Sequence, residues 1–242
     1  MSEAVKNEIV WVTGGGSGIG FAVARRLAKD GHAVAISGRD AEKLTRAAKE
    51  IERETGSKVF VVAADVTKAS DVDRSVNAIR DHFKRDVSIL VSNAGISPFT
   101  TFSETSTEEF DEVIAINLKG GFLTARAVIP AMYAAGRGAI VEILSVASEK
   151  AFKGGAAYIA SKFAMRGFTD TLREEARKHN VRVIAVLPGA TETALWDEDE
   201  RTKYHERMMQ PEDVAGVVFD ALKTPERALI EEIRMRPIVG DL

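Results

Sequence analysis

The stretch EIVWVTGGGSGIGFAVARRLAKDG, residues 8–31, decides the fold. An apolar run rich in β-branched residues passes through a glycine-rich turn into a segment with helical periodicity, which predicts a strand, a turn and a helix. Glycines at this turn permit a tight bend and a close approach of backbone to ligand, while the free amides of the helix attract an anion. We therefore expect the turn to bind the pyrophosphate of a dinucleotide; a glycine-rich turn without ligand is the alternative. The residues expected to take part are Gly14, Ser17, Gly18, Ile19 and Gly20.

The rest of the chain repeats the alternation of apolar runs and charged helical segments. Near-continuous apolar strands between helices are typical of a parallel sheet buried on both faces. We predict an α/β fold, a doubly wound parallel sheet of about seven strands with helices on both faces, forming a single domain over residues 1–242. The further strands are expected at 33–37, 58–65, 88–95, 138–145 and 181–189, with a last strand in 227–240.

Composition narrows the class of protein. With 45% apolar and 29% charged residues and a net charge of −3, the chain resembles an ordinary globular protein, and nucleic acid is not expected as a partner. It has no cysteine, which excludes disulfides and thiolate nucleophiles. Its four histidines show no ligand spacing, so no metal site is expected. No leader or membrane-spanning run is apparent, which favours a cytoplasmic protein without membrane contact.

Residues 193–210 are the one irregular stretch. Charge is dense there, and Leu195, Trp196, Tyr204 and Met208 recur at roughly helical spacing. A mobile helical flap over a site and a plain surface helix that packs these residues inward both fit this pattern.

The second apolar run ends in SGRDAEK, residues 37–43. Enzymes that use NAD place an acidic residue about 20 positions beyond the glycine loop, but Gly38 occupies that place here, followed by Arg39. A guanidinium can bind the 2′-phosphate of NADP, whereas a carboxylate would repel it. The sequence therefore favours NADP. The alternative is that Arg39 is only a solvated surface charge, because Ser17 in the loop offers no second cation for the phosphate.

The segment YIASK places Tyr158 and Lys162 four residues apart. On a helix such residues share a face, so the phenol and the ammonium would lie side by side. Chance produces this spacing often enough that the pair alone is weak evidence.

Several motifs in order add weight to that pair. TGGGSGIG (13–20), DV (65–66), SNAG (92–95), NLKG (117–120), Ser145, YIASK (158–162) and PGATET (188–193) occur in the order and spacing of one family. The chain resembles the short-chain dehydrogenase/reductase family over nearly its whole length. The resemblance implies that Asp65 and Val66 hold the adenine. The alternative for Asp65 is that its side chain caps the next helix. The further cofactor-binding residues that it implies are Asn93, Ala94, Gly95, Tyr158, Lys162, Pro188, Gly189, Thr191 and Thr193.

The resemblance also implies a catalytic set of Asn117, Ser145, Tyr158 and Lys162. Tyr158 would exchange a proton with the substrate oxygen, and the ammonium of Lys162 would lower the pKa of the phenol and hold the nicotinamide ribose. The Ser145 hydroxyl would bind the substrate oxygen, and Asn117 would support a water-linked proton path. The expected activity is that of an NADP-dependent ketone or aldehyde reductase, reversible as a secondary-alcohol dehydrogenase. A 3-oxoacyl-thioester reductase and a non-catalytic NADP-binding sensor are the alternatives.

Three positions depart from the family pattern. Ser92 and Glu142 stand where asparagine is frequent, and Leu144 stands where a second serine is frequent. A carboxylate on a central strand needs partners that the sequence does not identify. The segments 107–136 and 156–179 are apolar enough to pack against a second copy in a homodimer or homotetramer. The small-molecule substrate pocket is expected to be lined by Ser97, Pro98, Phe99, Ala147, Phe152 and residues 193–210.

Overall fold

The computed structural model describes residues 7–225 and 227–240. Within them lies a seven-stranded parallel sheet with the order β3-β2-β1-β4-β5-β6-β7, which confirms the predicted doubly wound α/β fold. The strands are β1 Ile9–Thr13, β2 Ala33–Gly38, β3 Val59–Ala63, β4 Ile89–Ser92, β5 Gly138–Ile143, β6 Val181–Pro188 and β7 Glu232–Met235.

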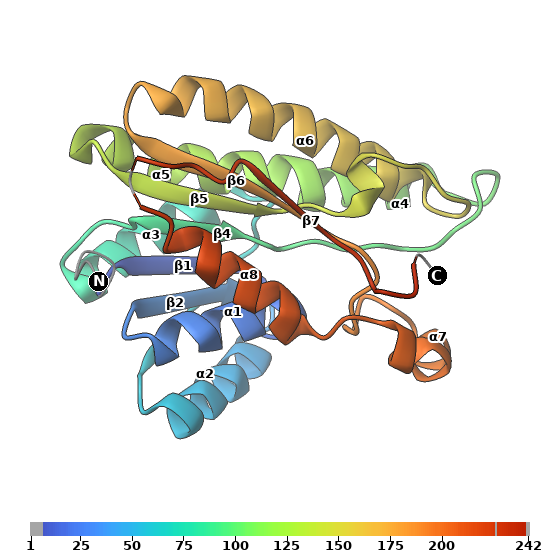
Figure 1. The fold of residues 1–242 in the computed structure, drawn as a ribbon, viewed down its shortest axis with the longest axis horizontal. Coiled ribbons are helices and arrows are strands. Elements are labelled where there is room, and N and C mark those ends of the chain that lie inside the picture. The colour runs from blue at the N-terminus through green and yellow to red at the C-terminus, as the bar shows by residue number, and fades with distance from the viewer. Residues whose placement is uncertain (1–6, 226, 241–242) are drawn as a thin grey trace.

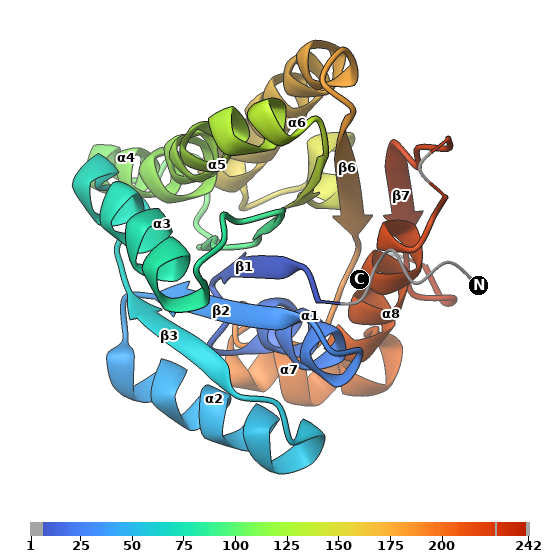
Figure 2. The ribbon, with the colours of Figure 1, turned by 90° about the vertical axis from the view of Figure 1, so that its left-hand side faces the viewer.

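Helices cover both faces of this sheet (Figures 1 and 2). One layer contains α1 (Gly18–Lys29), α2 (Ala41–Thr55) and α8 (Pro211–Leu222). The other contains α3 (Ala69–Phe83), α4 (Thr107–Ile114), α5 (Gly121–Ala135) and α6 (Ala156–Arg177). Each layer encloses its own cluster of buried apolar side chains, which is why the central strands read as continuous apolar runs rather than alternating ones.

The strand order reverses between β1 and β4, since the chain builds the sheet outward from β1 in one direction and then from β4 in the other. In open α/β sheets ligands bind in the crevice beyond the carboxyl ends of the strands at such a switch point. The loops after β1, β4, β5 and β6 therefore converge on one place, and all four carry predicted site residues.

The helical stretch Thr107–Ala135 is interrupted by a π-helical turn, η2 (Ala115–Gly120), between α4 and α5. By length and composition this stretch could cross a membrane, but half of its most apolar window is buried within the protein. It packs against β4, β5, α3 and α6, so its apolar character is accounted for largely by the core.

Residues 193–210 form neither a single helix nor an inward-packed surface. They comprise α7 (Glu198–Tyr204) and a short 3₁₀ turn, η4 (His205–Arg207), and of the apolar residues only Met208 is fully buried. Backbone hydrogen bonds from Glu192 to Met209 and from Met209 to Ala190, at 2.8 and 3.0 Å, join the two ends of the segment. Figure 1 shows α7 set apart from both helical layers. A role as a flap stays a prediction.

Candidate active site

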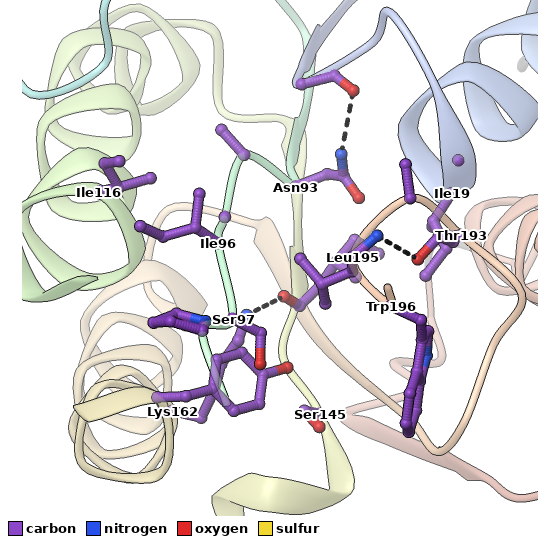
Figure 3. Close-up of a pocket in the computed structure, with 18 of the residues that line it drawn as sticks. Ile19, Asn93, Ile96, Ser97, Ile116, Ser145, Lys162, Thr193, Leu195 and Trp196 are labelled. Carbon is purple, nitrogen blue, oxygen red and sulfur yellow. Dashed lines mark hydrogen bonds between the residues drawn. The ribbon is translucent and has the colours of Figure 1, made fainter. Parts of the chain in front are cut away.

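A cleft of about 1500 Å³ lies at the carboxyl ends of the strands. All the predicted cofactor-binding and catalytic residues line it except Gly20 and Asn117, which lie just behind its wall. Figure 3 shows Ile19, Asn93 and Thr193 towards one end of the cleft and Ser97, Ser145, Lys162 and Trp196 towards the other. The fold thus brings together residues as far apart in the sequence as Gly14 and Thr193, as expected from the shared edge of parallel strands.

The loop between β1 and α1 has the conformation of an anion-binding turn. Gly14 and Gly18 have φ angles of 66° and 56°, in the left-handed region that favours glycine. Ser17 precedes α1, and no acidic residue occupies the first turn of that helix, so its N-terminal amides face the cleft without a competing carboxylate. These features fit the pyrophosphate of a dinucleotide.

Asn93 and Thr13 clamp the glycine loop to the end of β4. The Thr13 hydroxyl accepts hydrogen bonds from the backbone amides of Asn93 and Ala94, at 3.0 and 3.1 Å. The Asn93 side chain donates to the carbonyl groups of Thr13 and Gly14, at 3.0 and 3.3 Å. Besides lining the cleft, Asn93 therefore fixes the shape of the phosphate loop.

Two cations flank the site where the adenosine ribose would lie. Arg39 follows β2, is exposed, and its nearest acidic partner is Glu112 at 3.7 Å. Lys43, in the first turn of α2, also lines the cleft, and its Cγ lies 3.4 Å from where a Cβ on Gly16 would be. The sequence predicts no second cation, because Ser17 occupies the loop position where one was sought. The position of Lys43, four residues after Arg39 at the start of α2, was the signal that could have indicated it.

Asp65 caps the turn after β3 as well as lining the cleft. Its carboxylate accepts hydrogen bonds from the amide and the hydroxyl of Thr67, at 3.0 and 2.8 Å. Although burial opposes the shift, these bonds and the charge of Lys68 hold the pKa of Asp65 below its usual value. Asp65 thus closes the turn before α3 rather than capping that helix, whose N-cap is Lys68, and the adenine contact stays a prediction.

Tyr158, Lys162 and Ser145 lie together at the other end of the cleft. The Lys162 ammonium donates a hydrogen bond to the Ile143 carbonyl at 3.0 Å and lies 5.7 Å from the centre of the Tyr158 ring. Tyr158 is 8% exposed. Burial raises the pKa of its phenol, and the hydrogen bond with Ser145 opposes this only in part. The lowering of this pKa by Lys162 together with the positive nicotinamide of a bound oxidised cofactor stays a prediction.

Asn117 lies in the π-helical turn η2, behind the cleft. Its side-chain oxygen accepts from the Ile96 amide at 2.9 Å, and its nitrogen donates to the Ile96 carbonyl at 2.9 Å and to the Ser161 hydroxyl at 3.0 Å. Asn117 thus ties the loop after β4 to α6. Local π-helical turns often occur at functional sites, and this one turns the amide towards both partners.

The loop after β6 reaches back to the phosphate end. Pro188, Gly189, Thr191 and Thr193 line the cleft, and the Thr193 methyl group would lie 3.1 Å from a Cβ on Gly18. Thr193 thus borders the phosphate loop, while Trp196, three residues later, lies at the substrate end of the cleft.

Aromatic side chains from three loops gather at the substrate end. Phe99 stacks on Trp196 with ring centres 5.4 Å apart, and its ring centre lies 6.1 Å from that of Phe152. The Ser97 hydroxyl is buried and has no hydrogen-bond partner within the described part of the chain. Ala147, expected to line the pocket, is instead fully buried because it lies in the 3₁₀ turn η3 (Val146–Ser148) that packs against α6.

Comparisons with known proteins agree with this geometry. The family model described as short chain dehydrogenase matches residues 8–204. A sepiapterin reductase from Chlorobaculum tepidum is 36% identical over 241 residues, covering 97% of this chain and 98% of the relative.

Solved structures are similar over the same length. A metagenomic short-chain oxidoreductase in complex with NADP has a TM-score of 0.84 at 33% identity, covering 97% of this chain and 99% of the other. An alcohol dehydrogenase from the archaeon Thermococcus sibiricus, complexed with 5-hydroxy-NADP, has a TM-score of 0.88 at 30% identity, covering 98% and 99%.

Proposed function

Because the chain belongs to the short-chain dehydrogenase family, we propose that it is an NADPH-dependent reductase of ketones and aldehydes, reversible as a secondary-alcohol dehydrogenase. The observation that carries the proposal is the placement of Ser145, Tyr158 and Lys162 in the same cleft as the glycine loop and Arg39. A dinucleotide laid along this cleft would present its nicotinamide to the hydroxyl groups and its adenosine to the cation.

The preference for NADP rests on charge. Arg39 and Lys43 lie on the adenosine side of the cleft, and Gly38 occupies the place of the carboxylate that would repel a 2′-phosphate. NADP and 5-hydroxy-NADP in two similar structures support the same cofactor here.

Each catalytic residue has a distinct task. When bound, the nicotinamide supplies or accepts the hydride. Tyr158, whose buried phenol stays protonated near neutral pH, would donate its proton to the carbonyl oxygen as charge develops there. The Ser145 hydroxyl would hold that oxygen, and Lys162 would bind the ribose and stabilise the phenolate left after proton transfer. Asn117 would keep the Ile96 loop and α6 in register around them.

The substrate end favours a carbonyl compound with a planar or bulky apolar part. Phe99, Phe152 and Trp196 offer an aromatic wall, and the Ser97 hydroxyl, which has no partner among the residues that the structure describes, offers a hydrogen bond to a polar substituent. Sepiapterin belongs in the substrate panel because a relative of that activity is 36% identical.

The thioester alternative has less support from the surface. A carrier protein would need a basic landing surface, and the sequence offers only the scattered Arg126, Arg137 and Arg166. Arg166 is bound to Glu149 and Glu232 and Arg137 to Glu8, while Arg126 lies over the Phe122 ring. A cofactor-binding sensor has no need of the Ser145 and Tyr158 arrangement.

Kinetics with a carbonyl panel tests the proposal. We expect NADPH oxidation with ketones or aldehydes, a lower kcat/KM with NADH, and a fall of at least about a hundredfold in Tyr158→Phe, since general acid catalysis contributes factors of this order. Parent-level turnover by Tyr158→Phe would refute the mechanism. Tight NADPH binding without turnover of any carbonyl or alcohol would favour the sensor.

We also expect assembly into a homodimer or homotetramer. Phe122 on α5 and Phe163 on α6 are 41% and 46% exposed, on the helices predicted to meet a second copy. Light scattering measures the mass directly, and a strict monomer would contradict this expectation. A cytoplasmic location remains the expectation from sequence.

A further inference from the structure

Ser145 stands at the start of a short helical turn outside the sheet. It precedes the 3₁₀ turn η3, and its hydroxyl accepts a hydrogen bond from the Ala147 amide at 3.1 Å. The Ser148 hydroxyl donates to the Ser145 carbonyl at 2.6 Å. A single 3₁₀ turn has poorer hydrogen-bond geometry than an α-helix, so its placement depends on what holds it from outside. Any movement of η3 therefore moves the Ser145 hydroxyl.

An ion pair joins the end of this turn to α6. Glu149 follows η3, and its Oε1 accepts a hydrogen bond from the Arg166 guanidinium at 2.8 Å. Arg166 lies on α6, about one turn beyond Lys162 and two turns beyond Tyr158. Neither member of the pair lines the cleft. The pair thus connects the turn that carries Ser145 with the helix that carries the phenol and the amine.

Two residues of the edge strand β7 complete a network of four charges. Arg234 donates to Glu149 Oε1 at 2.5 Å, and Arg166 also donates to Glu232 at 2.8 Å. The side chains of Glu149 and Arg166 are 16% and 30% exposed, so solvent screens their attraction less than that of a fully exposed pair. Although burial opposes the shift, the hydrogen bonds from Arg166 and Arg234 hold the pKa of Glu149 below its usual value. Glu149 is therefore ionised near neutral pH.

We propose that Glu149 and Arg166 are positioning residues whose ion pair sets where the Ser145 hydroxyl stands relative to the phenol of Tyr158. Because both lie outside the cleft, they act through Ser145 rather than on the substrate. The kinetic part of this inference rests on the proposed function, whereas the placement of Ser145 is measurable without turnover.

The physical reason is that the two hydroxyl groups come from different elements. Ser145 belongs to the end of β5 and to η3, Tyr158 belongs to α6, and η3 packs against α6. Both side chains line the same cleft, where each is expected to reach one substrate oxygen. A misplacement of about 1 Å can cost about a hundredfold in rate. The rigid fork of the Arg166 guanidinium, held by two carboxylates, fixes a position as well as supplying a charge.

A matched pair of variants separates positioning from stability. Glu149 and Glu232 each accept a hydrogen bond from Arg166 at 2.8 Å. Each also lies within 4.0 Å of Arg234. Only Glu149 belongs to the turn that carries Ser145, whereas Glu232 lies on β7. Glu149→Ala and Glu232→Ala should therefore both lower the melting temperature, but only Glu149→Ala should displace Ser145.

The direct readout is the ¹³Cζ resonance of Tyr158 in protein with labelled tyrosine, because this carbon is sensitive to hydrogen bonds of the phenol oxygen. The chain has three tyrosines, so Tyr158→Phe assigns the resonance. Ser145→Ala gives the displacement that follows complete loss of the Ser145 hydroxyl. We expect Glu149→Ala to move the resonance in the same direction and Glu232→Ala to leave it in place.

Steady-state kinetics of carbonyl reduction provides the second readout. Glu149→Ala should lower kcat about tenfold, as a misplaced catalytic group does, and leave the KM for NADPH unchanged. Arg166→Met should lower kcat by less, because Arg234 still holds Glu149. The double variant Glu149→Ala/Arg166→Met should match Glu149→Ala alone, since the two residues act as a unit. Glu232→Ala should keep the parent kcat.

The comparison of the two carboxylates decides the outcome. Equal responses of Glu149→Ala and Glu232→Ala in the resonance and in kcat would overturn the inference, as would a parent-level kcat in Glu149→Ala. If the parent protein reduces no carbonyl, the proposed function fails, yet the Tyr158 resonance still shows whether the pair positions Ser145. If Glu149→Ala does not fold, Glu149→Gln and Glu232→Gln, which keep the size of the side chain and remove its charge, decide the same comparison.

Discussion

Gly20→Ala is expected to damage folding and cofactor binding together, because Gly20 is where α1 passes closest to the glycine loop. A Cβ at this position would lie 2.5 Å from the Gly14 carbonyl oxygen and 2.5 Å from Asn93 Nδ2. These are the atoms that clamp the loop, since Asn93 Nδ2 donates to the Gly14 carbonyl at 3.3 Å. The new methyl group would therefore push apart the contact that shapes the phosphate site.

The magnitude follows from two opposing terms. Alanine in place of glycine within a helix stabilises by up to about 1 kcal/mol. Overpacking a well-filled site costs about 1–3 kcal/mol, and the upper part of that range applies here because one of the two neighbours is backbone that cannot rotate away. We expect a net loss of about 1–2 kcal/mol in the free energy of unfolding. Displacing the loop should also weaken NADPH binding about tenfold, equivalent to about 1.4 kcal/mol.

Gly167→Ala is the matched control. Gly167 also lies within a helix, α6, but it is exposed and a Cβ there would meet no atom within 4 Å. Only the helix term applies, so this variant should be as stable as the parent or up to about 1 kcal/mol more stable, with unchanged cofactor affinity.

Urea unfolding and fluorescence titration with NADPH measure both quantities. If Gly20→Ala matched Gly167→Ala in stability and in affinity, the loop would have room that the structure does not give it, and the reasoning would fail. A loss of stability without loss of affinity would place the damage in helix packing alone.

Three further predictions concern charge, hydrogen bonding and pH. The double variant Arg39→Ala/Lys43→Ala should reduce kcat/KM for NADPH by about tenfold or more, because it removes both cations expected to bind the 2′-phosphate. The kcat/KM for NADH, which lacks that phosphate, should stay nearly unchanged; steady-state kinetics with both cofactors measures the two values. Asn117→Ala should lower stability by about 1–3 kcal/mol in urea unfolding, because it leaves the amide and carbonyl of Ile96 unpaired, and should lower kcat. Burial lowers the pKa of His32 from 6.5, although the charges of Asp30 and Glu8 oppose the shift. The neutral imidazole therefore contributes stability above pH 6.5, and this contribution is lost as the pH falls through the lowered pKa of the folded state. His32→Gln should reduce the loss of stability between pH 7 and pH 5; an equal loss in parent and variant would contradict this.

The order of the elements could be predicted because the signals involved are local. The apolar runs of β1 and β2 and the charged helical segments between them show their periodicity within a few residues. The predicted strands at 58–65 and 88–95 proved longer than β3 and β4, because residues 64–65 and 93–95 leave the ladder and line the cleft.

The site was predictable to the extent that its motifs are contiguous. The glycine loop and YIASK each place their groups within one turn or loop, and the cleft contains them together. Lys43 was missed because its approach to Gly16 depends on how α2 packs beside the loop.

The sequence by itself determined the alternation of strands and helices, the loop that can bend around a phosphate, and the presence of a phenol and an amine on one helical face. Those properties follow from local periodicity and residue type. Only the tertiary structure decided that Glu142 is buried in the sheet and that the phenol of Tyr158 has a raised pKa. Burial and the distance between charges depend on the packing of distant segments, and no window of sequence contains them.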